Sequence, residues 1–419
     1  MPTVSSTGTC QEKRAGLTKT MKIALVAQEY PPETAHGGIG SQNLMKAQGL
    51  AALGHEVHVI SHSPDAQRRE RRDGEVHVVR IPGPDAQFPI ATDAARWVTY
   101  SALVAAAVSQ LHAKRALDLV DFPDWGSEAF VHLLNQEDWN HIPTVIHLHG
   151  PVVMFAHEIG WPDLASDFYR VARMMEETCV RRADAVFSSS RCSARWCAEH
   201  YGLNVDRIPV LHAGIDTDRF RPLDLPKDAR PTIIFVGKIE KSKGVDVLVD
   251  AACGLARELP DLRLRLRLLG RGDCQLALDL EQRTVAAGFP DLLELAGFVP
   301  REQLPQHLCR SHVFAAPSVY EGGPGFVYLE AMACGLPVIA CSGSGASEGV
   351  SDGENGVLVP PGNVGAVAEA LRKLFSDAQM RASMGERAHQ YVLRHAGREQ
   401  CIRRLEAFYL EVAQRVCGG

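Results

Sequence analysis

Two glutamates flank a run of glycines in the segment of the sequence that is richest in chemical signals. Glu321 follows an apolar stretch, and Glu330 lies in what we predict to be the first turn of a short helix. The residues that follow Glu321 are Gly322, Gly323, Pro324, Gly325 and Phe326. Glycines let a backbone approach a ligand closely, and a helix start favours anions and acceptor oxygens. Glu330 therefore suits the vicinal hydroxyls of a ribose, unless it only complements the helix dipole.

A lysine-rich loop follows another apolar run. Gly237 ends that run, and Lys238, Lys241 and Lys243 lie in the next six residues. Because the loop leads from a buried strand into a helix, the helix dipole and the full charges would act together on a diphosphate. A solvated surface is the alternative for any lysine-rich loop. Its position at the carboxyl end of a strand favours the phosphate interpretation.

A third glycine-rich segment contains Gly37, Gly38 and Gly40. It is similar to a dinucleotide fingerprint, but ten residues separate Ala27, at the end of the preceding apolar run, from Gly38. Asn43 also stands at the third glycine position, so a dehydrogenase is disfavoured. We predict a mobile loop whose backbone N–H groups approach an anionic or hydroxyl-rich ligand, with a simple turn as the alternative.

The elements that would position these residues are strands alternating with helices. Continuous apolar runs are typical of parallel strands that are covered on both faces. Residues 22–27 form such a run, and the other predicted strands of the first half are residues 56–61, 75–81, 117–122, 143–148 and 184–189. In the second half they are residues 232–237, 261–270, 292–297, 312–317, 336–341 and 356–360. The pattern predicts an α/β protein with two doubly wound domains that face a central cleft.

A proline-rich, charged stretch at residues 219–231 interrupts this alternation. We place the domain boundary there, so that residues 21–222 form the first domain and residues 223–395 the second. Residues 1–20 read as a disordered tail without the apolar run of a secretory signal. The last helix, about 396–419, is expected to return to the first domain.

Composition narrows the class of protein further. The 419 residues carry a formal net charge of -6, which gives no bulk attraction for nucleic acid. Eleven cysteines without a CxxC pair are typical of reduced thiols in a cytoplasmic protein. The least charged long stretch is too short and too polar to span a bilayer. The run RRERR at residues 68–72 reads as a charged loop, and a weak peripheral contact with an anionic membrane stays open.

Taken together, these segments resemble glycosyltransferase family 4, whose members are retaining enzymes with the GT-B fold of two Rossmann-like domains. The resemblance extends from Met21 to about Tyr409. It is carried by GHEVHVI (54–60), HLHGP (147–151), HAGIDTDRFRP (212–222), GKIEKSKG (237–244), LLGRGD (268–273), GFVPREQL (297–304) and the 321–330 segment. The resemblance implies transfer of a sugar from a nucleoside diphosphate sugar, with UDP or GDP expected, to an acceptor hydroxyl. No cofactor and no metal ion are expected.

The resemblance also implies roles for individual residues. Glu330 would hold the donor ribose, and Glu321 would contact the donor sugar, although eight residues separate them where the family has seven. Lys243 would bind the pyrophosphate, assisted by Lys238, which stands where the family usually has arginine. His149 would lie near the transferred sugar.

The remaining donor contacts would come largely from backbone. They are assigned to Gly322, Gly323, Pro324, Gly325 and Phe326 for the sugar and phosphates, and to Gly237, Gly270, Phe298 and Val299 for the nucleotide. The loop at Gly37, Gly38 and Gly40 would close over phosphates or acceptor.

Some patterns leave alternatives open. Asp216-Thr217-Asp218 looks like a metal-binding DxD, but it lies in the interdomain stretch, where the aspartate of the family is structural. His147 and His149 would point to one face of a strand, yet no third metal ligand is identifiable. A nucleotide-sugar epimerase of similar fold and a non-catalytic nucleotide-sugar binding protein remain as alternative functions. The sequence does not indicate the oligomeric state.

Overall fold

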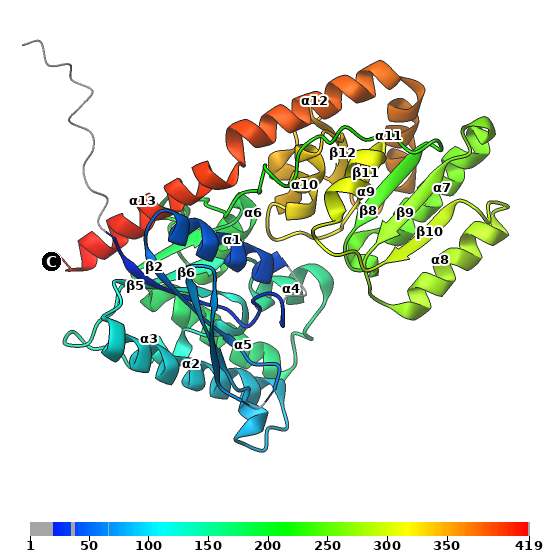
Figure 1. Ribbon diagram of the computed structural model, residues 1–419. Helices are drawn as coiled ribbons and strands as arrows, with labels where there is room; N and C mark the ends of the chain where they lie inside the picture. Colours follow the sequence, from blue (N-terminus) through cyan, green and yellow to red (C-terminus); the bar gives the residue numbers. More distant parts are fainter. Residues whose placement is uncertain (1–19, 35–37, 66, 418–419) are drawn as a thin grey trace, which may run out of the picture.

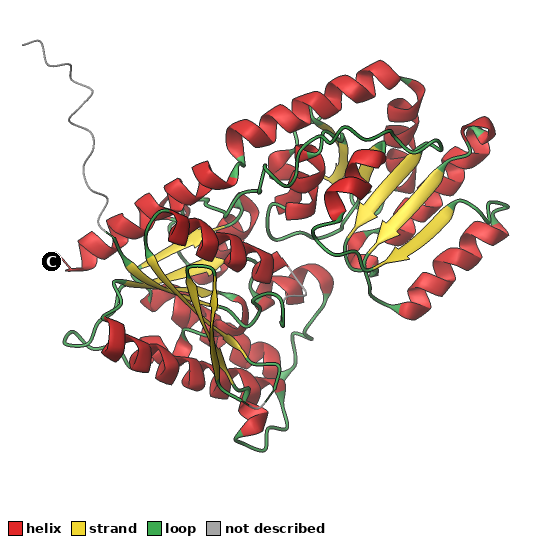
Figure 2. Ribbon diagram, in the orientation of Figure 1, coloured by secondary structure: helices red, strands yellow, loops and turns green. Residues whose placement is uncertain are grey.

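The computed structural model describes residues 20–34, 38–65 and 67–417, and it contains two α/β domains (Figure 1). Each domain has a central sheet with helices on both faces (Figure 2). Of the predicted tail at residues 1–20, only Thr20 belongs to the described residues. Gly37 also lies outside them. The predicted fold class is confirmed.

The first sheet has seven strands in the order β3-β4-β2-β1-β5-β6-β7. All neighbouring strands are parallel except β3, which is antiparallel to β4. The strands are β1 Lys22–Val26, β2 Glu56–His62, β3 Arg69–Asp73, β4 Val76–Ile81, β5 Leu119–Pro123, β6 Thr144–Leu148 and β7 Ala185–Ser188. The helices are α1 Gly38–Ala52, α2 Asp93–Arg115, α3 Phe130–Leu134, α4 Val152–Ile159, α5 Asp167–Arg182 and α6 Arg191–Tyr201.

The second sheet has six parallel strands in the order β10-β9-β8-β11-β12-β13. The strands are β8 Thr232–Val236, β9 Arg265–Leu269, β10 Leu293–Gly297, β11 Val313–Ala316, β12 Val338–Cys341 and β13 Gly356–Val359. The helices are α7 Val245–Glu258, α8 Cys274–Ala286, α9 Leu304–Arg310, α10 Phe326–Ala333, α11 Val364–Ser376, α12 Ala378–His395 and α13 Arg398–Cys417. Short 3₁₀ turns include η3 Trp125–Ser127, η5 Lys241–Lys243 and η7 Gly345–Gly349.

Helix α13 crosses from the second domain onto the first, where it packs against α1 (Figure 1). A Cβ atom added to Gly49 would lie 2.6 Å from Ile402, so the two helices are in close contact. His55 and Glu406 form a further contact of 2.9 Å between Nε2 and Oε1. Ala396 and Gly397 separate α12 from α13.

The charged run at residues 68–72 is not a loop, as we expected, but contributes to the edge strand β3. Its side chains are mostly exposed, so it lacks the apolar signal by which the other strands are recognised. Charged side chains on an edge strand also discourage pairing with other chains. The strand could therefore not be predicted from an apolar pattern, because its side chains face solvent at the edge of the sheet.

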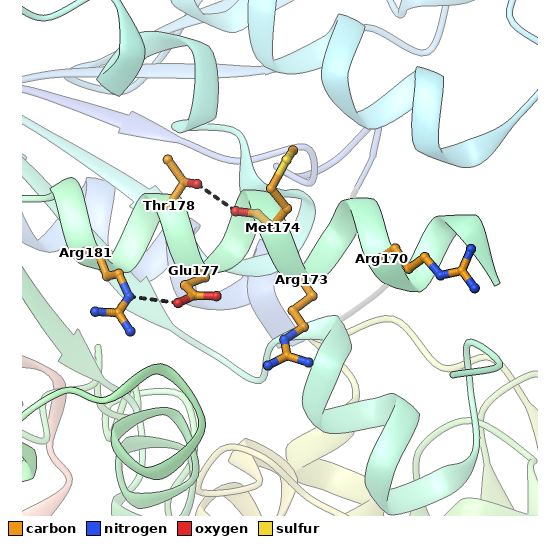
Figure 3. A pocket seen from close by; sticks show the side chains of 6 residues that line it. All are labelled: Arg170, Arg173, Met174, Glu177, Thr178 and Arg181. Atoms are coloured by element: carbon orange, nitrogen blue, oxygen red, sulfur yellow. Dashed lines mark hydrogen bonds and ion pairs between the residues drawn. The ribbon is translucent and has the colours of Figure 1, made fainter. Parts of the chain in front are cut away.

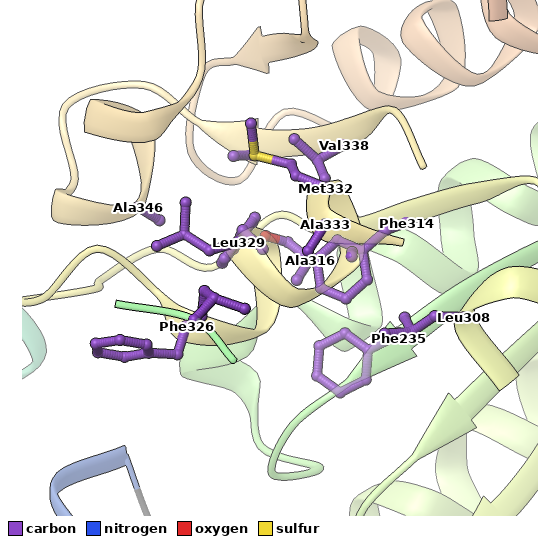
Figure 4. Close-up of a cluster of buried hydrophobic side chains, with 14 of the residues drawn as sticks. Phe235, Leu308, Phe314, Ala316, Phe326, Leu329, Met332, Ala333, Val338 and Ala346 are labelled. Carbon is purple, nitrogen blue, oxygen red and sulfur yellow. Dashed lines mark hydrogen bonds between the residues drawn. The ribbon is translucent and has the colours of Figure 1, made fainter. Parts of the chain in front are cut away.

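Apolar packing around α10 fixes the helix that carries Glu330. Phe326, Leu329 and Met332 lie among side chains of β8, β11, β12 and α9 (Figure 4). The hydroxyl of Tyr328 donates to the carbonyl of Ala316 at the end of β11. Because seven of its eight residues are buried, α10 has little freedom to move independently of the sheet.

Candidate active site

Lys243 and Glu321 form an ion pair at the carboxyl edge of the second sheet. The Nζ atom of Lys243 lies 2.8 Å from Oε1 of Glu321, and both side chains are about one fifth exposed. The turn η5 presents the lysine, and the backbone N–H of Val319 donates to the carbonyl of Ser242 in the same turn at 2.9 Å. Gly244 closes the turn with φ +68°, where an added Cβ would lie 2.1 Å from the carbonyl oxygen of Pro317. The turn is thus held tightly against the segment that leads to Glu321.

Glu330 lies in the second turn of α10, not in the first turn as predicted. Only 1% of the residue is exposed, and its carboxylate is ion-paired with Arg301. Burial raises the pKa of Glu330 above its ordinary value, and the guanidinium of Arg301 opposes that shift. The carboxylate of Glu330 is buried among the apolar side chains around α10. The guanidinium of Arg301, rather than the helix dipole, therefore balances its negative charge.

Arg301 was not singled out from the sequence, although it lies in the segment 297–304. Besides Glu330 it contacts Ser41 of α1 at 3.4 Å, and its guanidinium lies 5.3 Å from the ring centroid of Phe220. Ser41 belongs to the first domain, so Arg301 links the carboxylate of Glu330 to the opposite side of the interdomain space.

The glycine segment after Glu321 contacts both domains through its backbone. The carbonyl of Gly322 accepts hydrogen bonds from Ser190 and from Ser193, the latter at 2.7 Å. A Cβ atom at Gly322 would lie 3.0 Å from the carbonyl oxygen of His149. Behind the segment, a Cβ atom at Gly345 would lie 2.4 Å from the carbonyl oxygen of Gly323. The close approach of these backbones therefore depends on glycine.

The three remaining residues of this segment have different surroundings. Pro324 faces a separate hollow near the linker between the domains, and Gly325 is the N-cap of α10 with φ +55°. Phe326 is buried and packs edge-on against His212, with ring centroids 6.0 Å apart. Phe326 therefore acts as a packing residue in this structure, while its backbone lies at the helix start.

Three glycines meet at the carboxyl ends of β8, β9 and β10. The N–H of Gly237 donates to the carbonyl of Leu269, and the N–H of Gly270 donates to that of Gly297. A side chain at Gly270 would collide with the carbonyl of Gly237, since an added Cβ would lie 1.8 Å from that oxygen. Gly297 is exposed, and Gly237 and Gly270 are partly exposed, at the edge of the sheet where ligands of such folds bind.

Two other predicted donor residues lie beside these glycines. Phe298 is 63% exposed, and the guanidinium of Arg271 lies 5.4 Å from its ring centroid. Val299 is half-buried. Lys238, directly after Gly237, is exposed.

Gly38 and Gly40 belong to helix α1, so the prediction that they form a loop is wrong. The helix begins at Gly38, within the segment that we expected to be a loop. Gly38 is exposed at the helix start, whereas Gly40 is buried.

His149 lies at the end of β6, opposite the glycine segment. Its backbone N–H and that of Gly150 donate to the two carboxylate oxygens of Asp124, each at 3.0 Å. Burial raises the pKa of Asp124 to about 6. Burial lowers the pKa of His149 well below its ordinary value, with a smaller contribution from Lys46. His149 is therefore a neutral imidazole near pH 7, and Asp124 holds the turn that positions it.

Other residues around this turn were also missed by sequence reasoning. Asp124 directly follows β5, so the rule that ligands bind at the carboxyl ends of strands could have identified it. Glu348 in η7 accepts the N–H groups of Arg191 and Cys192 at 2.8 and 2.7 Å, across the domain interface. No motif signals Glu348, because its partners are backbone groups of a distant helix.

The rings of His147 and His149 do share one face of the strand, with centroids 3.8 Å apart. Asp216 is engaged by Arg398 of α13 at 3.0 Å, which gives the DxD segment a structural contact. Within residues 20–34, 38–65 and 67–417, no group of three His, Cys, Asp or Glu side chains is arranged to hold a metal ion.

The surface is also hollowed along α5 and near the linker between the domains. The hollow along α5, of about 430 Å³, is lined by Arg170, Arg173, Met174, Glu177, Thr178 and Arg181 (Figure 3). The other, of about 470 Å³, lies near the linker and includes Ser189, His212, Pro324, Glu348 and Arg404. The first contains none of the predicted residues, and the second contains only Pro324.

None of the helices in the described part of the chain has the length and apolar character needed to cross a bilayer. Among the described residues, nine cysteines are free thiols and most of them are buried.

Comparison with known proteins places these observations in a family. Residues 36–219 match the family described as Glycosyltransferase Family 4, and residues 230–377 match Glycosyl transferases group 1. The chain is 30% identical over 416 residues to alpha-maltose-1-phosphate synthase of Mycolicibacterium smegmatis, covering 91% of this chain and 95% of that protein.

Solved structures show the same fold. The structure is similar to sucrose-phosphate synthase from Thermosynechococcus elongatus with a TM-score of 0.78, at 21% identity over 94% of this chain and 99% of that one. Anabaena HepE in complex with UDP-glucose gives a TM-score of 0.70, at 21% identity over 93% of this chain and 99% of that one. With its two facing α/β domains and matches along both halves, the chain belongs to the family 4 glycosyltransferases and is a glycosyltransferase with the GT-B fold.

Proposed function

We propose that the protein transfers a sugar from a nucleoside diphosphate sugar to an acceptor hydroxyl, with retention of the anomeric configuration and without a metal ion. The pair of Lys243 and Glu321 carries the proposal, because it holds a cation beside the glycine segment at the carboxyl edge of the second sheet. HepE, whose structure contains UDP-glucose, makes UDP the first nucleotide to test, with GDP as the alternative.

In this proposal the second domain, residues 223–395, binds the donor. Glu330 accepts hydrogen bonds from the ribose hydroxyls, and Arg301 must give up its contact with Oε1 of that carboxylate if the ribose takes this oxygen. Gly237, Gly270, Phe298 and Val299 contact the nucleotide. The first domain, residues 21–222 with the returning helix at 396–419, binds the acceptor.

The reaction breaks the bond between the anomeric carbon and the diphosphate oxygen. Negative charge grows on the leaving diphosphate, and the ammonium of Lys243, with Lys238 nearby, stabilises that charge as a preorganised cation. The acceptor oxygen attacks from the face that the diphosphate leaves, and its proton passes to a leaving phosphate oxygen. No protein nucleophile takes part in this scheme.

Glu321 and His149 lie on opposite sides of the sugar in this arrangement. Glu321 contacts the sugar hydroxyls and orients Lys243, and His149 approaches from the first domain. The carbonyl of Gly322, held by Ser190 and Ser193, brings the two sides together.

A thermal-shift panel of UDP, GDP and ADP tests the donor site, since a ligand that binds the folded state raises the melting temperature. The absence of a response to all three would contradict the proposal. The nucleotide that binds then selects the sugar donors for transfer assays. NMR of the product must show the anomeric configuration of the donor, and activity must persist in EDTA.

The same assays separate the alternatives. Label that appears only in an altered nucleotide sugar or in free sugar would identify an epimerase or a hydrolase. Binding without turnover across a wide acceptor panel would identify a binding protein. Activity that EDTA abolishes and manganese restores would contradict metal independence.

A further inference from the structure

A buried lysine lies beneath the two histidines at the end of β6. Lys46 of α1 is only 2% exposed, and its Nζ atom lies 2.5 Å from Oδ2 of Asp121 in the middle of β5. The same Nζ atom lies 3.2 Å from Nδ1 of His147. A buried ammonium needs such partners, because an isolated charge in a protein interior is strongly destabilising.

The lysine determines which nitrogen of His147 carries the proton. An ammonium has three donors and no acceptor, so Nδ1 of His147 must accept and the proton of this neutral ring lies on Nε2. Burial, with His149 and Lys46 nearby, lowers the pKa of His147 well below its ordinary value, which keeps the ring neutral. The Nε2–H group then donates to Oγ of Ser189 at 2.8 Å.

The direction of donation continues from Ser189 to the second histidine. The hydroxyl of Ser189 donates to Oε1 of Gln42 at 3.2 Å. The amide nitrogen of Gln42, 3.2 Å from Nδ1 of His149, donates to that nitrogen. Gln42 and Lys46 stand four residues apart, on one face of α1, so a single helix supplies both contacts.

Nδ1 of His149 therefore accepts, and its proton lies on Nε2. That atom is buried and has no hydrogen-bond partner among the residues that the structure describes. A buried N–H group without a partner is rare in folded proteins, and it points to a ligand that supplies the acceptor. The site opposite His149 is the one to which we assign the transferred sugar.

We propose that Lys46 is a positioning residue that, through His147, Ser189 and Gln42, holds His149 in the Nε2–H tautomer, so that His149 donates a hydrogen bond to an oxygen of the transferred sugar. This inference rests on the proposed function for the identity of the ligand. The hydrogen-bond chain itself, which we call the Lys46 relay, is a property of the protein without ligand. Its members are Lys46, His147, Ser189, Gln42 and His149.

The returning helix supports the start of the relay. The hydroxyl of Tyr409 in α13 donates to the same oxygen of Asp121 that binds Lys46. Tyr409 and Asp121 are both buried, at 0% and 1% exposure. The helix that crosses from the second domain thus contacts Asp121, the partner of Lys46, at the end of the relay that is farthest from His149. This contact gives the C-terminal segment a role in the geometry of the site.

Nitrogen-15 NMR of histidine-labelled protein tests the relay without any ligand. The expected result is a pyridine-type Nδ1 and a protonated Nε2 for His149, assigned by comparison with His149→Gln. His389 provides an internal reference of the opposite kind, because its Nδ1 lies 2.7 Å from the carbonyl of Ala333 and must donate. A protonated Nδ1 in His149 of the unmodified protein would overturn the proposal.

The substitution Gln42→Glu reverses the direction of the hydrogen bond between residue 42 and Nδ1 of His149. A carboxylate only accepts, so Nδ1 of His149 must become protonated and its nitrogen-15 signal must move to the position of a pyrrole-type nitrogen. Gln48→Glu on the exposed face of the same helix is the matched control and should leave the His149 signals unchanged. Unchanged signals in Gln42→Glu would also overturn the proposal.

Lys46→Met leaves the buried carboxylate of Asp121 without its counter-charge, so this variant is expected to destabilise the fold. Ser189→Ala is the second variant, since it breaks the relay without removing a charge, and it should allow both tautomers of His149. The result that would contradict the relay is a single Nε2–H tautomer in Ser189→Ala identical to that of the parent protein.

Kinetics separate the relay from the proposed function. With the donor that the nucleotide panel identifies, Gln42→Glu should lower kcat about tenfold, the effect of one lost hydrogen bond, with little change in nucleotide affinity. Full turnover in His149→Ala would contradict the role of His149 in transfer while the NMR result could still stand. Loss of turnover in His149→Ala together with the wrong tautomer would contradict the relay alone.

Discussion

The ammonium of Lys243 lies 2.8 Å from the carboxylate of Glu321, although the two stand 78 positions apart in the sequence. Lys243 follows β8 and Glu321 follows β11, and these strands are neighbours in the second sheet. Their side chains meet because parallel strands present their carboxyl ends at one edge. The pair fixes a cation next to the glycine segment before any ligand arrives.

Lys243→Ala should reduce turnover by about a hundredfold to a thousandfold, as for other preorganised groups that stabilise a leaving anion. The half-buried pair contributes little to folding, so the melting temperature should change by only a few degrees. Lys241→Ala, an exposed lysine in the same turn, is the control for general loss of positive charge. Equal effects of the two substitutions on kcat would contradict a specific role for Lys243.

Glu330→Gln should weaken nucleotide binding, because the ribose hydroxyls lose a charged acceptor and Arg301 loses its partner. The dissociation constant measured by calorimetry should rise about tenfold or more. Glu302→Gln, an exposed neighbour of Arg301, is expected to bind like the parent protein. If Glu330→Gln bound nucleotide with the parent affinity, the ribose assignment would be wrong.

Gly322→Ala should impair transfer more than folding. The added methyl group would lie 3.0 Å from the carbonyl oxygen of His149, so the second domain could no longer approach the first as closely. Turnover should fall at least tenfold while nucleotide binding persists. Gly254→Ala in α7, where an added Cβ meets no atom within 4 Å, should leave turnover unchanged and stabilise the helix slightly.

Glu128 makes folding stability depend on pH. Burial raises the pKa of this carboxyl from 4.5 to about 8, so the folded protein holds a proton that the unfolded chain releases. The resulting stabilisation is complete below pH 4.5 and is lost as the pH rises to 8. Glu128→Gln should remove this loss and raise stability at pH 8 by on the order of a few kcal/mol.

Melting curves between pH 5 and pH 8 measure the effect. The exposed Glu137→Gln serves as control and should keep the slope of the parent protein. Parallel curves for the parent protein and Glu128→Gln would show that the carboxyl titrates normally. Glu176, with a pKa of about 8 from burial, should leave part of the slope in the Glu128 variant.

Twelve of the thirteen strands of the described chain could be predicted from the sequence because each contains several apolar residues, and most of these strands are buried in the sheets. The exception is β3, whose charged residues are stable on an edge because one side of the strand faces solvent. The start of α1 was misplaced because Gly38 and Gly40 look like loop residues when their packing is unknown.

Only part of the candidate site could be predicted from the sequence, because some of its residues act through partners that are distant along the chain. Lys243, Glu321 and Glu330 stand out because charge and glycine directly follow apolar runs. Arg301 and Gln42 carry no such signal, since each acts through a partner from a distant part of the chain.

The sequence by itself determined the family, the alternation of strands and helices, and the strand ends at which charged residues gather. These properties depend on local order and on neighbouring side chains. Tertiary structure alone decided that Arg301 neutralises Glu330 and that Lys46 lies under His147. The proton on His149 is decided in the same way, because the direction of a hydrogen-bond chain depends on which donors and acceptors meet in space.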